Sequence, residues 1–210
     1  MTLRAIRVLK ECVFVLCEDT RVTRKLLDRH EITTQTMSYH QHSAEEKKKE
    51  IFSLLSQGKN LALVTDAGTP GISDPGNELI SFLLEQCPGL KIMPVPGPSA
   101  LAAIASVAGI PMDKFLFLGY PPHKKGRKTF FEKVSQSGYP VVLYESPHRI
   151  TKTLGELRNA DPAFCVVVGR ELTKEFEEVL RGSIDSVLAV LEAKKKLLGE
   201  FVLVAYRRDS

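Results

Sequence analysis

The stretch Leu61-Ala-Leu-Val-Thr-Asp-Ala-Gly-Thr-Pro-Gly-Ile-Ser-Asp-Pro-Gly76 joins an apolar run to a loop with three glycines and two prolines in eleven residues. A short apolar run bounded by turn-forming residues is typical of a buried strand. Glycine lets the backbone take positive φ and approach a ligand closely, and proline stiffens a loop. The stretch therefore predicts a strand whose carboxyl end opens into a ligand-binding loop. A tight surface turn is the alternative that composition leaves open.

Apolar runs alternate with segments of helical period along the rest of the chain. We expect strands near residues 12–17, 61–65, 91–95, 115–119, 140–145, 163–169 and 201–206. Helices are expected to follow the strands throughout. One should begin at the capping box Ser43-Ala-Glu-Glu46 and stop at Gly58, and another should have Ser146 as its N-cap and Pro147 in its first turn. This alternation predicts two α/β domains with mainly parallel sheets.

The best candidate linker is Ala108-Gly-Ile-Pro-Met-Asp113, because glycine and proline end one helical segment before the next apolar run begins. A boundary there gives an N-terminal domain over residues 1–112 and a C-terminal domain over residues 113–210. The first element is expected to be a helix, Thr2–Glu11, which runs directly into an inner strand.

Composition and missing motifs disfavour several classes of protein. The 210 residues are 43% hydrophobic and 26% charged, which is ordinary for a globular protein. No apolar run approaches the roughly 20 residues that cross a bilayer, and the amino terminus lacks a signal-peptide core, so we expect a cytoplasmic protein without a membrane partner. There is no Gly-x-Gly-x-x-Gly after a strand, no P-loop, no Gly-x-Ser-x-Gly and no His-Glu-x-x-His. Nicotinamide enzymes, P-loop nucleotidases and the common hydrolases are therefore disfavoured.

The four cysteines, Cys12, Cys17, Cys87 and Cys165, include no Cys-x-x-Cys pair. We expect Cys12 and Cys17 on one strand with their side chains on opposite faces. The spacing predicts neither a metal site nor a disulfide framework, so the expected role of these thiols is that of small buried apolar residues.

A second turn, Met93-Pro-Val-Pro-Gly-Pro-Ser-Ala100, precedes a helix of small residues that we expect over Ala100–Ala108. The amino terminus of a helix offers free N–H groups and positive potential, which suit a carboxylate or a phosphate. Tight packing of alanines on a sheet is the alternative interpretation of this segment.

Basic residues form two clusters in a chain of net charge +4. The first contains Arg21, Arg24, Lys25 and Arg29, and the second is His123-Lys-Lys-Gly-Arg-Lys128. Such clusters fit phosphate binding, although a solvated surface is the common alternative. Tyr120 and Phe130 flank the second cluster, where an aromatic ring can stack on an RNA base, but we expect Phe130 to belong to the core.

Five segments taken in order resemble the tetrapyrrole-methylase superfamily, and in particular its ribosomal RNA branch. They are Cys17-Glu-Asp-Thr-Arg-Val-Thr-Arg-Lys-Leu-Leu27, Val64–Gly76, Val95-Pro-Gly-Pro-Ser-Ala100, Leu143-Tyr-Glu-Ser-Pro-His-Arg149 and Gly169-Arg-Glu-Leu-Thr-Lys-Glu-Phe-Glu-Glu178. The resemblance implies a two-domain α/β enzyme, typically a homodimer, that binds S-adenosylmethionine in a cleft between its domains. Its ribosomal branch methylates the 2′-hydroxyl of a cytidine in the decoding region of small-subunit (16S) RNA, so the implied partner is that RNA and not DNA.

Carried over by motif, the cofactor contacts implied are Asp66, Gly68, Thr69, Ile72, Ser99 and Ala100, with Tyr144 as a wall from the second domain. The expected RNA contacts are Arg21, Arg24, Lys25, Lys124, Lys125, Arg127 and Lys128. The implied cofactor loops are the two turns selected above on physical grounds.

Methyl transfer to a ribose hydroxyl benefits from a general base and from a cation near the developing alkoxide. We expect Glu145 or His148 as the base and Arg170 or Lys174 as the stabiliser. Glu18, Asp19, Arg21, Arg149 and Glu171 are further cleft candidates. The alternative is that Glu145, Arg149, Arg170 and Glu171 form only ion pairs between the domains or bind RNA phosphates.

The chain departs from the family pattern at its beginning, because members normally start with a further strand and an Ala-Thr-Pro-Ile-Gly-Asn-type turn. We therefore expect an inner strand and part of the substrate site to be lacking. Two other functions stay open at this point. One is methylation of tetrapyrrole carbon atoms by a sister enzyme, and the other is a truncated, non-catalytic RNA-binding module.

Overall fold

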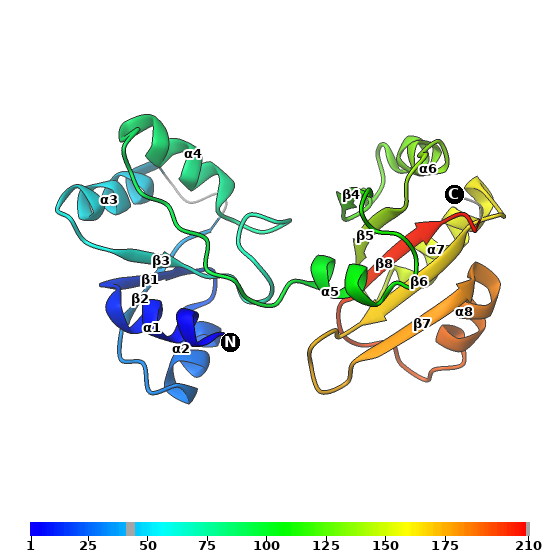
Figure 1. Cartoon of the computed structure of the whole chain (residues 1–210), viewed down its shortest axis with the longest axis horizontal. Coiled ribbons are helices and arrows are strands. Elements are labelled where there is room, and N and C mark those ends of the chain that lie inside the picture. Colours follow the sequence, from blue (N-terminus) through cyan, green and yellow to red (C-terminus); the bar gives the residue numbers. More distant parts are fainter. Residues whose placement is uncertain (41–44, 209–210) are drawn as a thin grey trace. The chain divides into compact units, whose positions relative to one another are not determined.

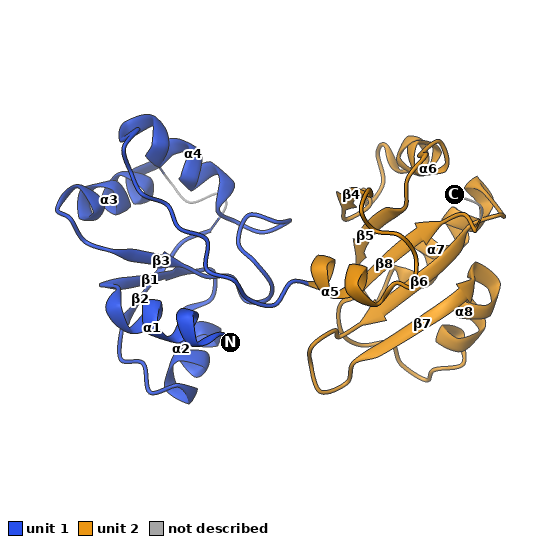
Figure 2. Ribbon diagram, in the orientation of Figure 1, with its two compact units in different colours: residues 1–99 blue, residues 100–210 orange. Residues whose placement is uncertain are grey.

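The computed structural model describes residues 1–40 and 45–208. The chain forms two compact units, Met1–Ser99 and Ala100–Ser210, which Figure 2 colours blue and orange. The units divide before helix α5 (Ala100–Val107), whereas the sequence placed this helix in the first domain. The reason is that Ile104 of α5 is fully buried against the sheet of the second unit.

The first unit is built on a parallel sheet of three strands in the order β2-β1-β3 (Figure 1). The strands are β1 (Phe14–Cys17), β2 (Gln35–Ser38) and β3 (Leu61–Leu63). The helices are α1 (Leu3–Glu11), α2 (Thr20–Arg29), α3 (Glu45–Ser56) and α4 (Asn77–Gln86). Val15 packs with residues of α1 and α2, and its neighbour Leu16 packs with residues of α3 and α4. Since successive strand residues point to opposite faces, each pair of helices covers one face of the sheet.

Helix boundaries in this unit follow from local signals. The first element is a helix, as the sequence predicts, but Thr2 lies just before it and caps it: the Thr2 hydroxyl accepts a hydrogen bond from the Ala5 N–H. Gly58, just after α3, takes φ +76°. Ser43 of the predicted capping box lies outside the described residues. Cys12 forms the C-cap of α1 and is not part of the strand on which we expected it.

The strand expected near 91–95 is absent, and this prediction was wrong. Residues 91–99 have no regular secondary structure, and Ile92 and Met93 are exposed. Pro94 and Pro96 have no N–H to donate to a sheet, which explains why an apolar run here forms an extended loop.

The second unit is built on five strands in the order β4-β5-β8-β6-β7. The strands are β4 (Leu116–Gly119), β5 (Val141–Glu145), β6 (Cys165–Arg170), β7 (Glu178–Ser183) and β8 (Phe201–Tyr206). Only β4 and β5 pair in parallel, so the mainly parallel sheet that we expected here is corrected to a mixed one. The cause is that β6 turns directly into β7 without a helix, and that β8 runs antiparallel between β5 and β6.

Four helices complete this unit: α5, α6 (Arg127–Ser135), α7 (Ile150–Ala160) and α8 (Ile184–Glu192). Leu143, Val166 and Leu203 face a large core shared with α6, α7 and α8, and Val142 and Val167 face α5. Helix α7 begins at Ile150 with Arg149 as its N-cap, so Ser146 is not the N-cap that the sequence predicts. The Ser146 carbonyl instead accepts hydrogen bonds from the Arg149 and Ile150 N–H groups, in a turn before the helix. The α/β class is confirmed.

Among the described residues, no helix is both long enough and apolar enough to span a membrane.

Candidate functional site

The loop after β3 is shaped by its glycines. Gly68, Gly71 and Gly76 have φ of +77°, +82° and +141°. The Gly71 N–H donates to the Pro75 carbonyl at 3.2 Å, and the Asn77 amide donates to the Gly71 carbonyl at 2.9 Å. A β-carbon on Gly71 would lie 2.7 Å from Asn77 Oδ1. The loop therefore has an internally bonded conformation that requires glycine at this position.

The second predicted loop, residues 93–99, lies against the first. The Thr69 hydroxyl donates to the Pro98 carbonyl at 3.4 Å. The Thr2 hydroxyl donates to the Pro96 carbonyl at 3.0 Å, which ties the loop to the start of α1. The structure thus brings together two segments that are far apart in sequence and that we selected separately.

Polar groups of the two loops are open to solvent. Asp66, Gly68 and Gly97 are exposed, whereas Thr69, Ile72 and Ser99 are partly buried. Within the described part of the chain, the Asp66 carboxylate has no hydrogen bond or ion pair. A β-carbon on Gly97 would meet nothing within 4 Å. An exposed carboxylate beside accessible backbone suits an organic ligand with amino and hydroxyl groups.

The end of β1 contributes a charged pair at the start of α2. Asp19 Oδ1 accepts from the Arg21 N–H at 2.8 Å, and the Arg21 guanidinium bonds both carboxylate oxygens at 3.1 and 2.8 Å. These bonds hold the pKa of Asp19 well below its usual range. Arg21 and Lys25 are exposed, but Arg24 is partly buried, bonds the Thr34 carbonyl and pairs with Asp28. Of these three predicted contacts, Arg21 and Lys25 are therefore open to solvent, and Arg24 is held inside the first unit.

In the second unit, two of the predicted catalytic residues, Glu145 and Arg170, are the last residues of β5 and β6, the strands on either side of β8. Glu145 of β5 and Arg170 of β6 both pair with Phe201 of β8, so they occupy one row of the sheet. Two strand spacings separate their backbones by about 10 Å. Tyr120 follows β4 at this same end. Tyr120, Glu145 and Arg170, which come from three separate stretches of the sequence, therefore lie at the same end of the sheet.

Glu145 is not open to a substrate in this structure, because it is only 1% exposed. One oxygen accepts from the Ser146 N–H at 2.7 Å and pairs with Arg149 at 2.8 Å. The other accepts from the Thr153 hydroxyl at 2.6 Å. His148, in contrast, is exposed and makes no hydrogen bond or ion pair with any described residue.

Both predicted stabilising cations are already paired. Arg170 Nε lies 3.1 Å from Glu178, and Lys174 Nζ lies 2.9 Å from both Glu171 and Glu200. Burial acts to lower the pKa of Lys174, but its bonds to the two carboxylates outweigh burial and raise it. The Glu200 N–H, followed by Lys174, lowers the pKa of Glu171. The Arg170–Glu178 and Lys174–Glu171 pairs lie within the β6–β7 hairpin, and the Lys174–Glu200 pair holds this hairpin to the segment before β8.

Aromatic rings surround Tyr144 on β5. Its ring meets Phe117 at 5.0 Å and Tyr120 at 5.6 Å, both edge-on. Tyr144 is partly buried, and Tyr120 is 47% exposed. Phe130 packs against the large core, which confirms its expected role.

The second basic cluster divides into exposed and buried members. His123, Lys124, Lys125 and Lys128 are exposed. Arg127 is only 6% exposed and pairs with Glu156 at 2.6 Å. The expectation that Arg127 contacts RNA is therefore corrected, because its guanidinium is used inside the protein. No sequence pattern pointed to Thr153 or Glu156 as its partners, since both lie on a helix 26 or more residues away.

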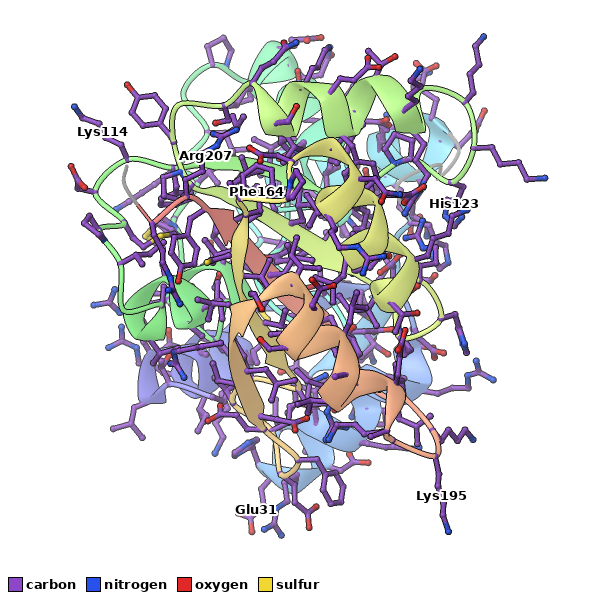
Figure 3. All side chains as sticks on the ribbon, turned by 90° about the vertical axis from the view of Figure 1, so that its right-hand side faces the viewer. Glu31, Lys114, His123, Phe164, Lys195 and Arg207 are labelled. Atoms are coloured by element: carbon purple, nitrogen blue, oxygen red, sulfur yellow. The ribbon has the colours of Figure 1, made fainter. Side chains whose placement is uncertain are left out.

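A hollow of about 420 Å³ lies at the other end of the second sheet. Its lining includes Ile110, Lys114, Tyr139, Tyr206 and Arg207, where β4 and β5 begin and β8 ends. In Figure 3, Lys114 and Arg207 lie on one side of the unit and His123 lies on the other. Arg207 stacks over Phe164 at 4.9 Å and pairs with Asp161. No residue that the sequence predicts as a site residue lines this hollow.

Across residues 1–40 and 45–208, no group of three or more His, Cys, Asp or Glu residues is placed to hold a metal ion.

The sequence and fold of this chain are similar to those of known proteins. The chain matches the model of Tetrapyrrole (Corrin/Porphyrin) Methylases over residues 1–188. It is 40% identical to ribosomal RNA small subunit methyltransferase I of Halalkalibacterium halodurans, over 97% of this chain and 70% of that protein. The proteins of the same name from a Hydrogenobaculum species and Thermotoga maritima are both 37% identical, over 100% and 97% of this chain and 91% and 90% of theirs.

Solved structures show the same fold at lower identity. A cobalt precorrin-4 methyltransferase of cobalamin biosynthesis superposes with a TM-score of 0.69 at 19% identity, covering 97% of this chain and 88% of that one. A conserved hypothetical protein from Aeropyrum pernix K1 gives 0.70 at 17% identity, covering 99% and 80%. These structural matches support the fold, and the sequence matches extend over nearly the whole chain. The chain therefore belongs to the tetrapyrrole (corrin/porphyrin) methylase family of methyltransferases.

Proposed function

We propose that this chain transfers a methyl group from S-adenosylmethionine to the 2′-hydroxyl of a cytidine in small-subunit ribosomal RNA. The observation that carries the proposal is the identity of 37–40% to proteins named ribosomal RNA small subunit methyltransferase I, over nearly the whole chain. The precorrin enzyme with the same fold is only 19% identical. This contrast favours RNA over a tetrapyrrole as the substrate.

The two joined loops of the first unit fit the cofactor. S-adenosylmethionine carries amino, carboxylate and hydroxyl groups and a cationic sulfur, and the exposed Asp66 carboxylate is an acceptor that bonds no other described residue. Gly68 and Gly97 leave the adjacent backbone accessible to a ligand. We assign the cofactor contacts to Asp66, Gly68, Thr69, Ile72, Ser99 and Ala100, with Tyr144 as a further contact. When bound, the cofactor supplies an electrophilic methyl group, and the contribution of the loops is to orient it.

His148 is the proposed general base, because it is the exposed member of the predicted pair. It would take the proton of the ribose hydroxyl through a ring nitrogen as the oxygen attacks. Glu145 has both oxygens committed to protein donors, so its assigned role is structural. Arg170 and Lys174 stay in the proposal as cations near the developing negative charge, although Arg170 is already paired with Glu178 and Lys174 with both Glu171 and Glu200.

Transfer of a labelled methyl group tests the proposal. We expect incorporation into unmethylated small ribosomal subunits, with the label on a cytidine ribose, and none into a uroporphyrinogen-type tetrapyrrole. Label in the tetrapyrrole alone would make the chain a carbon methyltransferase. Binding to RNA without calorimetric binding of S-adenosylmethionine would identify a non-catalytic RNA-binding module.

The resemblance also implies a homodimer, and the proposed ribosomal substrate suggests a cytoplasmic location; we include both in the proposal. Light scattering coupled to size-exclusion chromatography measures the mass directly, and a monomer mass near 23.3 kDa would contradict the dimer.

A further inference from the structure

A network of buried hydrogen bonds links Glu145, at the end of β5, to the loop that follows β4. The Thr153 hydroxyl donates to Glu145 at 2.6 Å and accepts from the Arg127 guanidinium at 2.7 Å. Thr153 is fully buried, and Glu145 and Arg127 are nearly so. Buried charges are tolerated only when they are paired and hydrogen-bonded, so the arrangement of these three residues is closely determined.

The network reaches two consecutive carbonyl groups of the loop. Arg127 donates to the Pro122 carbonyl at 2.8 Å, and Arg149 donates to the Pro121 carbonyl at 3.3 Å. Arg149 is in turn paired with Glu145. Pro121 is itself buried, and proline fixes φ at both positions. The Pro121-Pro122 turn is thereby held by two cations as well as by its own rings.

This turn leads directly into the exposed basic residues His123, Lys124 and Lys125. Gly126 follows with φ +80° and starts helix α6, where Arg127 turns inward. The basic run is thus anchored at both sides by the same buried arginine, through the Pro122 carbonyl before it and the helix after it.

We propose that Arg127, Thr153 and Arg149 are positioning residues for RNA binding. They fix the Pro121-Pro122 turn so that Lys124 and Lys125 are presented to RNA phosphates in one arrangement. This inference rests on the proposed function. A loop ordered in advance loses less conformational entropy on binding, so the network contributes to RNA affinity without touching RNA.

Thr153→Val tests this proposal without changing any charge, and Thr153→Ser is its matched control because serine keeps the hydroxyl. Relative to wild type, we expect the valine variant to bind unmethylated small ribosomal subunits about tenfold more weakly, roughly the cost of ordering two lysine side chains. The KM for RNA should rise similarly, with kcat and calorimetric binding of S-adenosylmethionine unchanged. Thr153→Ser should restore RNA affinity to within about twofold of wild type.

A double-mutant cycle separates positioning from a general loss of stability. In a Lys124→Ala/Lys125→Ala chain, Thr153→Val should have little further effect on RNA affinity, because the groups it positions are gone. RNA affinity unchanged by Thr153→Val, or lowered equally in both backgrounds, would overturn the inference. If circular dichroism shows that the valine variant is unfolded, Arg149→Lys takes its place, since lysine keeps the charge but cannot bond the Pro121 carbonyl in the same geometry. A wild-type chain that neither binds nor methylates the subunits would refute the proposed function itself.

Discussion

The hydroxyl of Thr69 donates a hydrogen bond to the carbonyl oxygen of Pro98 over 3.4 Å and thereby joins the two glycine- and proline-rich loops of the first unit. Each loop alone fits an ordinary turn as well as a ligand site. Their contact joins the loop that carries the exposed Asp66 carboxylate to the loop that carries the exposed Gly97 backbone. The cofactor proposal therefore depends on the conformation of the first loop, which glycine substitutions can test.

Gly71→Ala should weaken binding of S-adenosylmethionine. The residue has φ +82°, and a new β-carbon would lie 2.7 Å from Asn77 Oδ1, so both the backbone and the Asn77 contact would be strained. We expect the calorimetric Kd to rise about tenfold or more, equivalent to about 1.4 kcal/mol. Gly89→Ala is the matched control, because a β-carbon there meets nothing within 4 Å. Equal affinity for both variants would show that the loop conformation does not matter for the cofactor.

Asp66→Asn tests the carboxylate of the same loop. A hydrogen bond to a charged group contributes about 1.5 to 3 kcal/mol, so loss of the charge should raise the Kd for S-adenosylmethionine by about 10- to 100-fold. Stability should change little, because Asp66 is exposed and has no partner among the described residues. Asp113→Asn, at another exposed position, is the control. A thermal shift caused by Asp66→Asn, without a change in Kd, would assign the carboxylate to folding.

Glu145→Gln should mainly lower the free energy of unfolding, whereas His148→Ala should mainly lower the rate of methyl transfer. Glu145 is buried and paired with Arg149, and breaking a buried pair costs on the order of 3 to 5 kcal/mol of unfolding free energy. His148 is exposed, so its replacement should leave stability nearly unchanged and lower kcat by about 10²- to 10⁴-fold at saturating RNA.

Denaturant unfolding and single-turnover methyl transfer measure the two quantities separately. His30→Ala, a partly buried histidine in the first unit, serves as the control. Normal turnover of the His148 variant would remove the proposed base.

Local patterns in the sequence predict most elements of this fold and the two glycine- and proline-rich loops that we propose as the cofactor site. Continuous apolar runs mark the strands that are buried on both faces, such as Val141–Glu145 and Phe201–Tyr206. Strand Glu178–Ser183 escaped prediction because only Val179 and Leu180 are apolar and none of its residues is fully buried, so its formation depends on pairing with β6. The apolar run at 91–95 was predicted as a strand but does not form one, because Pro94 and the following Pro96 have no N–H to donate to a neighbouring strand.

Partners in the buried network were beyond prediction for a different physical reason. Arg127 belongs to a basic run, and its neighbours Lys125 and Lys128 are exposed. Only the packing of α6 on α7 brings its guanidinium to Thr153, 26 residues away. Burial of one charge in such a run is decided by tertiary contacts, which a local pattern does not record.

Stability of the second unit should fall in acid, and Glu171 should account for part of the loss. Its pKa lies below the ordinary 4.5 because the Glu200 N–H and the Lys174 ammonium bond its carboxylate. In the unfolded chain the carboxyl takes up a proton near pH 4.5, whereas in the folded chain it does so only at lower pH. The unfolded state therefore binds more protons in this window, and the free energy of unfolding falls as the pH falls.

Glu171→Gln should lower the free energy of unfolding at pH 7, and the difference from wild type should shrink as the pH falls from about 4.5 through the folded pKa. Denaturant titrations between about pH 3 and pH 7 measure this difference. Other carboxylates with lowered pKa, Glu178 and Asp161, are present in both proteins and cancel in the comparison. Glu175→Gln on the same hairpin is the control, because Glu175 is exposed and has no ion pair with any described residue. A gap between wild type and Glu171→Gln that stays constant down to pH 3 would mean that the carboxylate stabilises the hairpin through packing and not through its charge.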